Sequence, residues 1–153
     1  MSVLVISDLH LPFTHPRFLK FVKDVQKKYN TKQTVFIGDV VDLHALSFHE
    51  HDPDGLSPGQ EKLAAKKEVA KWYKAFPKAK VCIGNHDART VRIARKAGLP
   101  MDELKDFATS WGTPGWEWDW EFKINGVLYL HGTGASGKDD LVPASSSFHG
   151  SRD

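Results

Sequence analysis

Cysteine is almost absent from the sequence. Cys82 is the only cysteine in 153 residues, so the chain has no internal disulfide, and its composition suits a reducing compartment. No apolar run approaches the roughly 20 residues that cross a bilayer as a helix, and no basic stretch followed by a long apolar run opens the chain. We therefore expect a cytoplasmic protein without a membrane partner.

A strong excess of charge of one sign is missing as well. The formal net charge is +2, so composition alone gives little support to nucleic acid as a partner, although it leaves that partner open. Internal repeats are absent, and the 41% hydrophobic and 26% charged residues are typical of a globular protein. We expect a single domain over residues 1–153, because a chain of this length can bury a substantial core.

Short apolar segments alternate with helical patterns in the first half of the chain. Strands are predicted at residues 3–6, 34–37 and 80–83, the first of them fully buried. Apolar spacings of three and four predict a helix over 17–29. The motif SPGQ at 57–60 predicts the capped start of a helix that runs to about residue 76. This order predicts an α/β fold in which right-handed crossovers join parallel strands.

The buried positions expected in the second helix include Leu63, Ala70, Tyr73 and Phe76. The second half of the chain carries a basic helix over 88–97 that ends at Gly98, and a short helix over 102–111. Residues 116–122 alternate with period two and predict one strand, which the hairpin turn Asn125-Gly126 joins to a return strand over 127–130. Trp116, Trp118 and Trp120 share a face of that strand, where packing is favoured over stacking on nucleic-acid bases.

Potential metal ligands follow four of the predicted strands. They are Asp8 and His10, then Asp39 and Asp42, then Asn85, His86 and Asp87, and finally His131. A turn or a cap explains any one of these groups alone. Four such groups in one chain favour a shared site, because the carboxyl ends of strands in an open α/β sheet line one crevice. In an extended strand Asp8 and His10 also project toward the same side.

The ligand types narrow the choice of metal. Carboxylate, amide and imidazole groups without a thiolate suit Mn²⁺, Fe or Zn²⁺ better than a structural cysteine site. A carboxylate can bridge two ions, and a pair of ions can hold both the attacking and the leaving oxygen of a phosphoryl transfer. Asp39 is the natural candidate for that bridge.

The motifs D-x-H, G-D-x-x-D, G-N-H-D and H-G occur in this order, and together they resemble the calcineurin-like metallophosphoesterase superfamily. The resemblance covers residues 3 to about 137, and the segments HDPDGLSPG and HGTGASGK are most similar to small phosphoesterases of phage and bacterial genomes. It implies a four-layer α/β/β/α sandwich. It also implies a binuclear hydrolase that cleaves a phosphomonoester or phosphodiester with a metal-bound hydroxide as nucleophile.

The resemblance implies a ligand set for two divalent metal ions. Asp8 and His10 would bind the first ion, Asp39 would bridge the two, and Asn85 and His131 would bind the second. Manganese is the expected metal, with Fe, Zn, Ni or Mg as alternatives.

Four further residues receive catalytic or orienting roles. His86 would stand beside the scissile phosphate, as a general acid or as a donor to developing negative charge. Asp42 and Asp87 would orient neighbouring groups, and Arg89 would contact the phosphate of the substrate. The remaining basic residues of that helix are expected to form a charged face.

The sequence departs from the family pattern at its end. The family usually supplies a final G-H-x-H motif, whereas the only later histidine here is His149. Three explanations stay open: the chain is truncated or frameshifted and incomplete after about residue 137, a partner chain completes the site, or His149 substitutes in part. Truncation is favoured. All three predict weaker metal binding, and they predict an exposed sheet edge that promotes homo-oligomers.

The function therefore has two readings. The first is a metal-dependent phosphoesterase with impaired metal binding. The alternative is a non-catalytic, metal-poor remnant that binds a nucleotide or a partner protein. The histidine- and aspartate-rich loop over 44–54 is expected to be a solvated loop. The alternative is that it forms part of a substrate rim, whose candidates are His44, His49, His51, Asp52 and Asp54. His44, nearest to the motif at the second strand, is the favoured residue for that rim.

Overall fold

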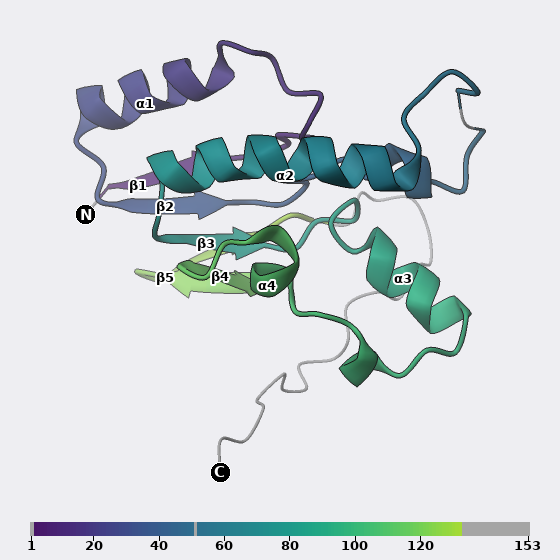
Figure 1. Ribbon diagram of the computed structural model, residues 1–153. Helices are drawn as coiled ribbons and strands as arrows, with labels where there is room; N and C mark the ends of the chain where they lie inside the picture. Colours follow the sequence, from purple (N-terminus) through teal and green to yellow (C-terminus); the bar gives the residue numbers. More distant parts are fainter. Residues whose placement is uncertain (1, 51, 133–153) are drawn as a thin grey trace.

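The computed structural model describes residues 2–50 and 52–132 (Figure 1). Four strands form a parallel sheet in the order in which they occur along the chain: β1 (Val3–Ile6), β2 (Gln33–Phe36), β3 (Ala79–Cys82) and β4 (Trp116–Asp119). Two further strands form an antiparallel hairpin: β5 (Glu121–Ile124) and β6 (Val127–Leu130). The helical elements are α1 (Phe18–Tyr29), η1 (His44–Leu46), α2 (Pro58–Ala75), α3 (Arg89–Lys96), η2 (Met101–Glu103) and α4 (Phe107–Trp111). The predicted α/β class is confirmed.

The parallel sheet has helices on one face and the hairpin over part of the other. Helices α1 and α2 lie on one face of the sheet (Figure 1). Leu4, Ile6 and Phe36 belong to the main hydrophobic core on that face. The β5–β6 hairpin packs on the other face, where Ile124 meets Val35 and Cys82. Helices, parallel sheet and hairpin thus form three successive layers in the part of the chain that the structure describes. Among these residues no helix is both long and apolar enough to cross a membrane.

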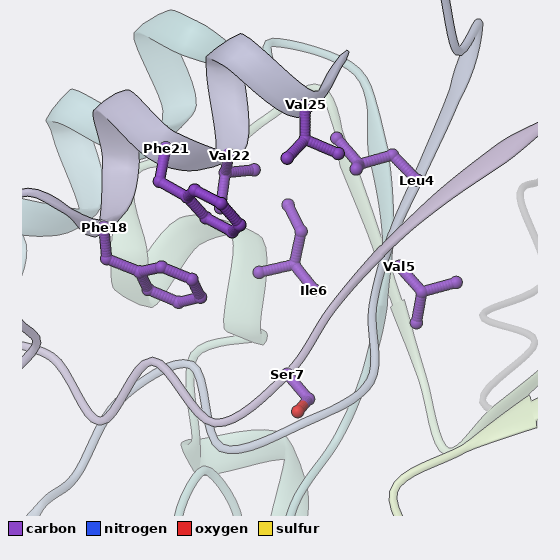
Figure 2. Close-up of a pocket in the computed structure, with 8 residues that line it drawn as sticks. All are labelled: Leu4, Val5, Ile6, Ser7, Phe18, Phe21, Val22 and Val25. Atoms are coloured by element: carbon purple, nitrogen blue, oxygen red, sulfur yellow. The ribbon is translucent and has the colours of Figure 1, made fainter. Parts of the chain in front are cut away.

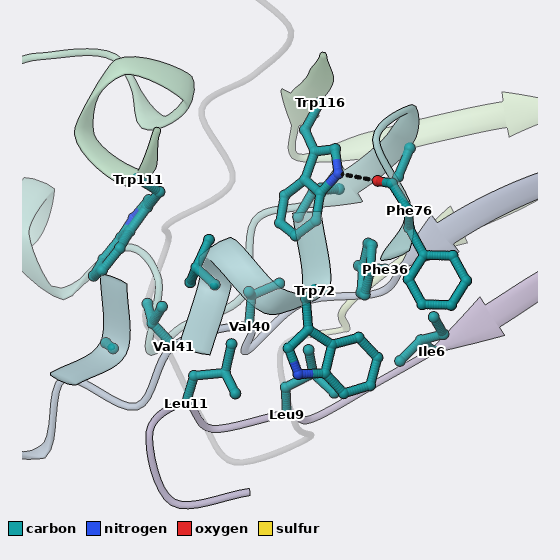
Figure 3. Packing of buried hydrophobic residues seen from close by; sticks show 14 of the residues in the cluster. Ile6, Leu9, Leu11, Phe36, Val40, Val41, Trp72, Phe76, Trp111 and Trp116 are labelled. Atoms are coloured by element: carbon teal, nitrogen blue, oxygen red, sulfur yellow. Dashed lines mark hydrogen bonds between the residues drawn. The ribbon is translucent and has the colours of Figure 1, made fainter. Parts of the chain in front are cut away.

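Aromatic side chains fill the core between α2 and the sheet. Trp72 of α2 is 1% exposed and packs edge to face with Phe36 of β2 (Figure 3). The indole Nε1 of Trp116 donates a hydrogen bond of 2.6 Å to the carbonyl of Phe76, which joins β4 to the end of α2. Trp118 is partly buried against the same core. The expectation that these tryptophans pack rather than stack on bases is confirmed for Trp116 and Trp118.

Helix α2 begins as the sequence predicts. Ser57 accepts a hydrogen bond from the backbone N–H of Gln60, and the Gln60 side chain accepts one from the N–H of Ser57, which completes a capping box.

The expected buried face of α2 is wrong in two of its four positions. The residues that face the core are Ala65, Val69 and Trp72, whereas Leu63 is 65% exposed and Ala70 is also exposed. Two residues correspond to about 200° of helix rotation, so Leu63 lies opposite Ala65. Packing of the large Trp72 ring fixes the rotation of the helix.

Two predicted elements are each split in the structure. The strand expected over 116–122 becomes β4 and β5, because the chain bends at Trp120, whose N–H donates to the Asp119 carboxylate at 2.7 Å. The helix expected over 102–111 becomes η2 and α4. Asp106 caps α4 by accepting the N–H of Thr109 at 2.8 Å, so this helix begins only at residue 107.

Strand β1 is the edge of the parallel sheet within the described residues. The expectation that this strand is fully buried is wrong. Val5 is 46% exposed, because the hairpin packs over β2 and β3 and leaves this end of the sheet uncovered. Figure 2 shows Leu4 and Ile6 pointing toward α1, whereas Val5 points to the other side of β1. The pocket between β1 and α1 is lined by apolar side chains and Ser7, so it offers none of the predicted metal ligands.

Candidate metal centre

The carboxyl ends of β1, β2 and β3 lie at one edge of the sheet. Ile6 pairs with Phe36, and Phe36 pairs with Val81, so the three following loops begin at the same level. Backbone hydrogen bonds then join the first two loops: the N–H of Asp8 donates to the carbonyl of Gly38, and the N–H of His10 donates to the carbonyl of Asp39. The motif residues of these loops are therefore brought together, as the sequence predicts.

The backbone of these loops is strained at the motif residues. Asp8, His10 and Asp39 have φ values of +53°, +46° and +50°. Each such residue costs on the order of 1–3 kcal/mol and persists only where the surrounding structure determines it. Strain of this kind concentrates at functional sites.

Two glycines of the motifs allow close approach between loops. A Cβ atom on Gly38, whose φ is +95°, would lie 2.6 Å from Cγ of His131. A Cβ atom on Gly84 would lie 2.9 Å from Cγ of Asp39. The site thus needs glycine at both positions, because any side chain there would displace a neighbouring metal-ligand candidate.

Asp8, His10 and Asp39 form one cluster of ligand atoms. His10 Nε2 lies 3.7 Å from Asp8 Oδ1 and 3.8 Å from Asp39 Oδ2, which is too long for hydrogen bonds. Two ligand atoms on one ion, with bonds of about 2.1 Å, are separated by roughly 3.0–3.5 Å. The observed separations are within a few tenths of an ångström of that range, so these three side chains fit a divalent cation.

A second group of ligand atoms also includes Asp39. His131 Nε2 is 3.2 Å from Asp39 Oδ2 and 2.9 Å from Asn85 Oδ1. These separations also match those of ligands on one ion, and the oxygen and nitrogen donors suit a divalent cation of the Mn²⁺ or Zn²⁺ type. Asp39 Oδ2 belongs to both clusters. The structure therefore brings together all five residues that the resemblance assigns to metal binding.

Asp42 lies between two histidines. Its Oδ1 is 2.7 Å from His10 Nδ1 and 3.2 Å from His86 Nδ1, so these three residues form a third group of potential ligands. The 2.7 Å contact is a charge-assisted hydrogen bond, which requires the proton on Nδ1 of His10. Nε2 of His10 then carries the electron pair of the ring, and this atom faces Asp8 and Asp39.

His86 and Arg89 lie beside the two clusters. His86 Nδ1 donates to the carbonyl of Asp42 at 2.8 Å, and its Nε2 lies 4.0 Å from Asp39 Oδ2. Arg89 Nη1 donates to the carbonyls of Asp42 and Leu43, both at 2.9 Å, and Nη2 lies 3.4 Å from His86 Nε2. The guanidinium thus holds the backbone of Asp42 and Leu43, next to His86. A contact between Arg89 and a substrate phosphate stays a prediction.

Asp87 is a buried carboxyl group that joins the loops after β2 and β3. It is 1% exposed and accepts hydrogen bonds from the N–H groups of Val41 and Gly84, at 3.1 and 2.9 Å. Burial raises the pKa of Asp87 to about 7, and the nearby Asp39 carboxylate adds to this rise against the opposing backbone hydrogen bonds. These hydrogen bonds join the loops that carry the ligand candidates.

One residue of the site escaped sequence reasoning. Glu61, in the first turn of α2, is 1% exposed and accepts two backbone hydrogen bonds of 2.7 Å, from His44 and Ala45. The sequence gives little signal for it, because an acidic residue in a first helical turn is ordinary.

Parts of the candidate rim are only partly placed. Asp52 and Asp54 are exposed in the loop after η1, and His44 is exposed as well, which agrees with a solvated loop. His51, His149 and the segment after Gly132 lie outside the described residues, so the three explanations for the absent G-H-x-H motif are not tested.

Comparison with protein families gives one match. A sequence model described as calcineurin-like phosphoesterase matches residues 1–149, which includes every motif segment named above. Comparison with curated proteins and with solved structures gave no significant match.

Proposed function

The chain belongs to the calcineurin-like phosphoesterase family, and we propose that it hydrolyses a phosphomonoester or phosphodiester at a pair of divalent cations. Family membership indicates metal-dependent phosphoesterase chemistry in general. The proposal adds that Asp8 and His10 hold one ion, that Asn85 and His131 hold the other, and that Asp39 binds both.

A single observation carries this proposal: the Nε2 atoms of three histidines surround one carboxylate oxygen. Asp39 Oδ2 lies 3.2 Å from Nε2 of His131, 3.8 Å from Nε2 of His10 and 4.0 Å from Nε2 of His86. In the same three residues Nδ1 faces an oxygen acceptor, at 2.7 to 2.8 Å. A proton on Nδ1 satisfies each of these acceptors, and it leaves the electron pair of Nε2 pointing at the centre.

The protein itself fixes the bridging carboxylate. The backbone N–H of His86 donates to Asp39 Oδ1 at 2.9 Å, which leaves Oδ2 for the ions. Asp39 is only 4% exposed, so water competes little for its oxygens. This arrangement supports a rigid ligand whose position is set before any cation binds.

Bound divalent cations would polarise a phosphoryl oxygen and acidify a water molecule. The side chains of the protein would then supply the proton for the leaving oxygen of the ester. His86 Nδ1 is occupied by the Asp42 carbonyl, so Nε2 is the atom of this ring that would take up a proton and then pass it to the leaving oxygen of the ester. Arg89, 3.4 Å from that nitrogen, stabilises negative charge in its neighbourhood.

The proposal is tested with purified protein, added Mn²⁺ and two generic substrates, p-nitrophenyl phosphate and bis(p-nitrophenyl) phosphate. We expect turnover of at least one ester, and a loss of more than about 100-fold in Asp39→Asn, since even residues that only support a metal ligand are worth 10- to 100-fold. Asp24→Asn is the matched control, because Asp24 is an exposed carboxylate on α1 that pairs with Lys20.

Two results would contradict the proposal. Equal turnover in wild-type protein and Asp39→Asn would show that the hydrolysis has another origin. No hydrolysis of either ester at any Mn²⁺ concentration would favour the non-catalytic, metal-poor remnant.

A further inference from the structure

Glu61 is a buried carboxylate that accepts hydrogen bonds from the backbone two and three residues after Asp42. It belongs to the first turn of α2, and its two oxygens accept the backbone N–H groups of His44 and Ala45, at 2.7 Å each. A carboxylate that is 1% exposed is costly to bury unless hydrogen bonds satisfy it. Here two charge-assisted bonds and the positive end of the α2 dipole provide that compensation.

The two N–H groups belong to residues 42–45, which we call the Asp42 segment. Asp42 is its first residue, and its carboxylate and carbonyl hold Nδ1 of His10 and of His86. Leu43 follows with φ of +50°, a left-handed conformation that is unfavourable for leucine. The segment would relax away from this conformation unless contacts on both sides maintained it.

The contacts on the two sides are complementary. Arg89 donates to the carbonyls of Asp42 and Leu43, at 2.9 Å each, and Glu61 accepts the N–H groups of the next two residues. A guanidinium thus holds the acceptors of the segment, and a carboxylate holds its donors. The Arg89 side chain is partly exposed, whereas Glu61 is buried. Water could therefore replace the hydrogen bonds of Arg89 more easily than those of Glu61.

We propose that Glu61 is a positioning residue for the metal centre: by holding the Asp42 segment, it keeps Asp42 on His10 and beside His86. Substitution of Glu61 should weaken binding of the first ion and slow proton transfer by His86, although no metal ligand is removed. This inference rests on the proposed function, since it assigns Glu61 a role in the same site.

Two substitutions separate this role from simple stability. Glu61→Gln keeps the size of the side chain, but its amide places an N–H₂ group against one of the two backbone donors. Glu61→Asp keeps the charge and shortens the reach, so it serves where Glu61→Gln does not fold. Val69→Ala is the matched control, because Val69 is fully buried on the same face of α2, two turns from Glu61, and belongs to the hydrophobic core.

The first measurement is Mn²⁺ affinity by titration calorimetry, well below the melting temperature of each variant. We expect about tenfold weaker binding of the tighter ion in the Glu61 variants, the lower end of the range for residues that support a metal ligand. At saturating Mn²⁺ we expect kcat to fall about tenfold with KM within twofold. Val69→Ala lowers the melting temperature but keeps the affinity and kcat within twofold.

The second measurement uses the metal-free protein and does not depend on turnover. The Nδ1 proton of His10, bonded to the Asp42 carboxylate at 2.7 Å, is expected as a downfield proton resonance in the wild type and in Val69→Ala. It disappears in the Glu61 variants if Asp42 has moved.

The outcomes divide as follows. A Glu61 variant that behaves like Val69→Ala, with unchanged affinity and an unchanged His10 resonance, overturns the inference. A wild-type protein without esterase activity refutes the proposed function alone, because Mn²⁺ affinity and the His10 resonance still decide the role of Glu61.

Discussion

Replacing Gly38 by alanine should remove His131 from the metal centre. The new Cβ would lie 2.6 Å from Cγ of His131, whereas ordinary contact begins at 3.4 Å, so the ring must retreat by about 0.8 Å. Metal–ligand bonds tolerate only about 0.2 Å. The retreat also weakens the 2.8 Å hydrogen bond from Nδ1 to the carbonyl of Ile37, worth roughly 0.5–1.5 kcal/mol. The second ion should then lose its imidazole ligand.

Backbone strain must be separated from this steric effect. Gly38 has φ of +95°, and a non-glycine residue with positive φ costs roughly 1–2 kcal/mol by itself. Gly98 is the matched control, because its φ is +70° and no atom lies within 4 Å of a Cβ placed there. Gly98→Ala should therefore lose stability by strain alone, and Gly38→Ala should lose roughly 1.5–3.5 kcal/mol when the displaced hydrogen bond is added.

The assay is Mn²⁺ titration followed by calorimetry, with denaturant unfolding as the measure of stability. Gly38→Ala should bind one ion with nearly normal affinity and the second at least tenfold more weakly, whereas Gly98→Ala should bind both as the wild type does. Equal binding of both ions by Gly38→Ala would refute the assignment of His131. So would an equal loss in Gly98→Ala.

Three other predictions concern stability and reactivity. Asp106→Ala should cost about 1 kcal/mol at pH 7 by removing the cap of α4. The backbone and hydroxyl hydrogen bonds of Thr109 lower the pKa of Asp106, so the stabilisation by this carboxylate is present above its usual pKa, near 4, and is lost as the pH falls. Urea unfolding of both proteins at several pH values measures it. A difference in unfolding free energy between wild type and Asp106→Ala that stays the same at pH 2 would contradict it. Burial is the main cause that raises the pKa of Cys82 to about 11, and two nearby carboxylates add to the rise. Iodoacetamide should therefore label Cys82 only after unfolding, and rapid labelling of the native protein would contradict its burial. Leu63→Ala should change the unfolding free energy by less than about 0.5 kcal/mol and Val69→Ala by roughly 2 kcal/mol, and the reverse order in urea would contradict the observed rotation of α2.

The meeting of Asp8, His10, Asp39 and Asn85 at one edge of the sheet was predictable because these residues follow parallel strands, whereas their assignment to metal ions, and that of His131, came from the family resemblance. Once residues 3–6, 34–37 and 80–83 are recognised as strands, their carboxyl ends must meet, and polar residues that follow them must be neighbours. The start of α2 was predictable for a similar reason. Ser57, Pro58 and Gln60 each satisfy a local requirement of a helix start, and no distant contact is needed to fulfil it.

Features that depend on tertiary packing were not predictable from the sequence. The rotation of α2 follows from how Trp72 fits against the sheet, and an apolar Leu63 gives no sign that it will be exposed. The strand over 116–122 alternates correctly along its length, yet it divides where the chain leaves one sheet for another at Trp120. Period two fixes which side chains share a face, and it does not fix which sheet they join.

The supporting residues of the site were the hardest to foresee. Glu61 looks like an ordinary residue of a first helical turn, and its burial appears only when the Asp42 segment packs across the start of α2. The proton positions on His10 and His131 depend on the acceptors at Nδ1, one of which is the backbone carbonyl of Ile37. Motifs list ligands, and the contacts that orient those ligands come from the fold.

The central claim is that Asp39 Oδ2 is shared by two cations. Crystals grown with Mn²⁺ and measured near the manganese absorption edge test it most directly. We predict two anomalous peaks about 3.5–4 Å apart, one beside Asp8 and His10 and the other beside Asn85 and His131, with Asp39 Oδ2 between them. A single peak, or two peaks of which only one contacts Asp39, would contradict the claim.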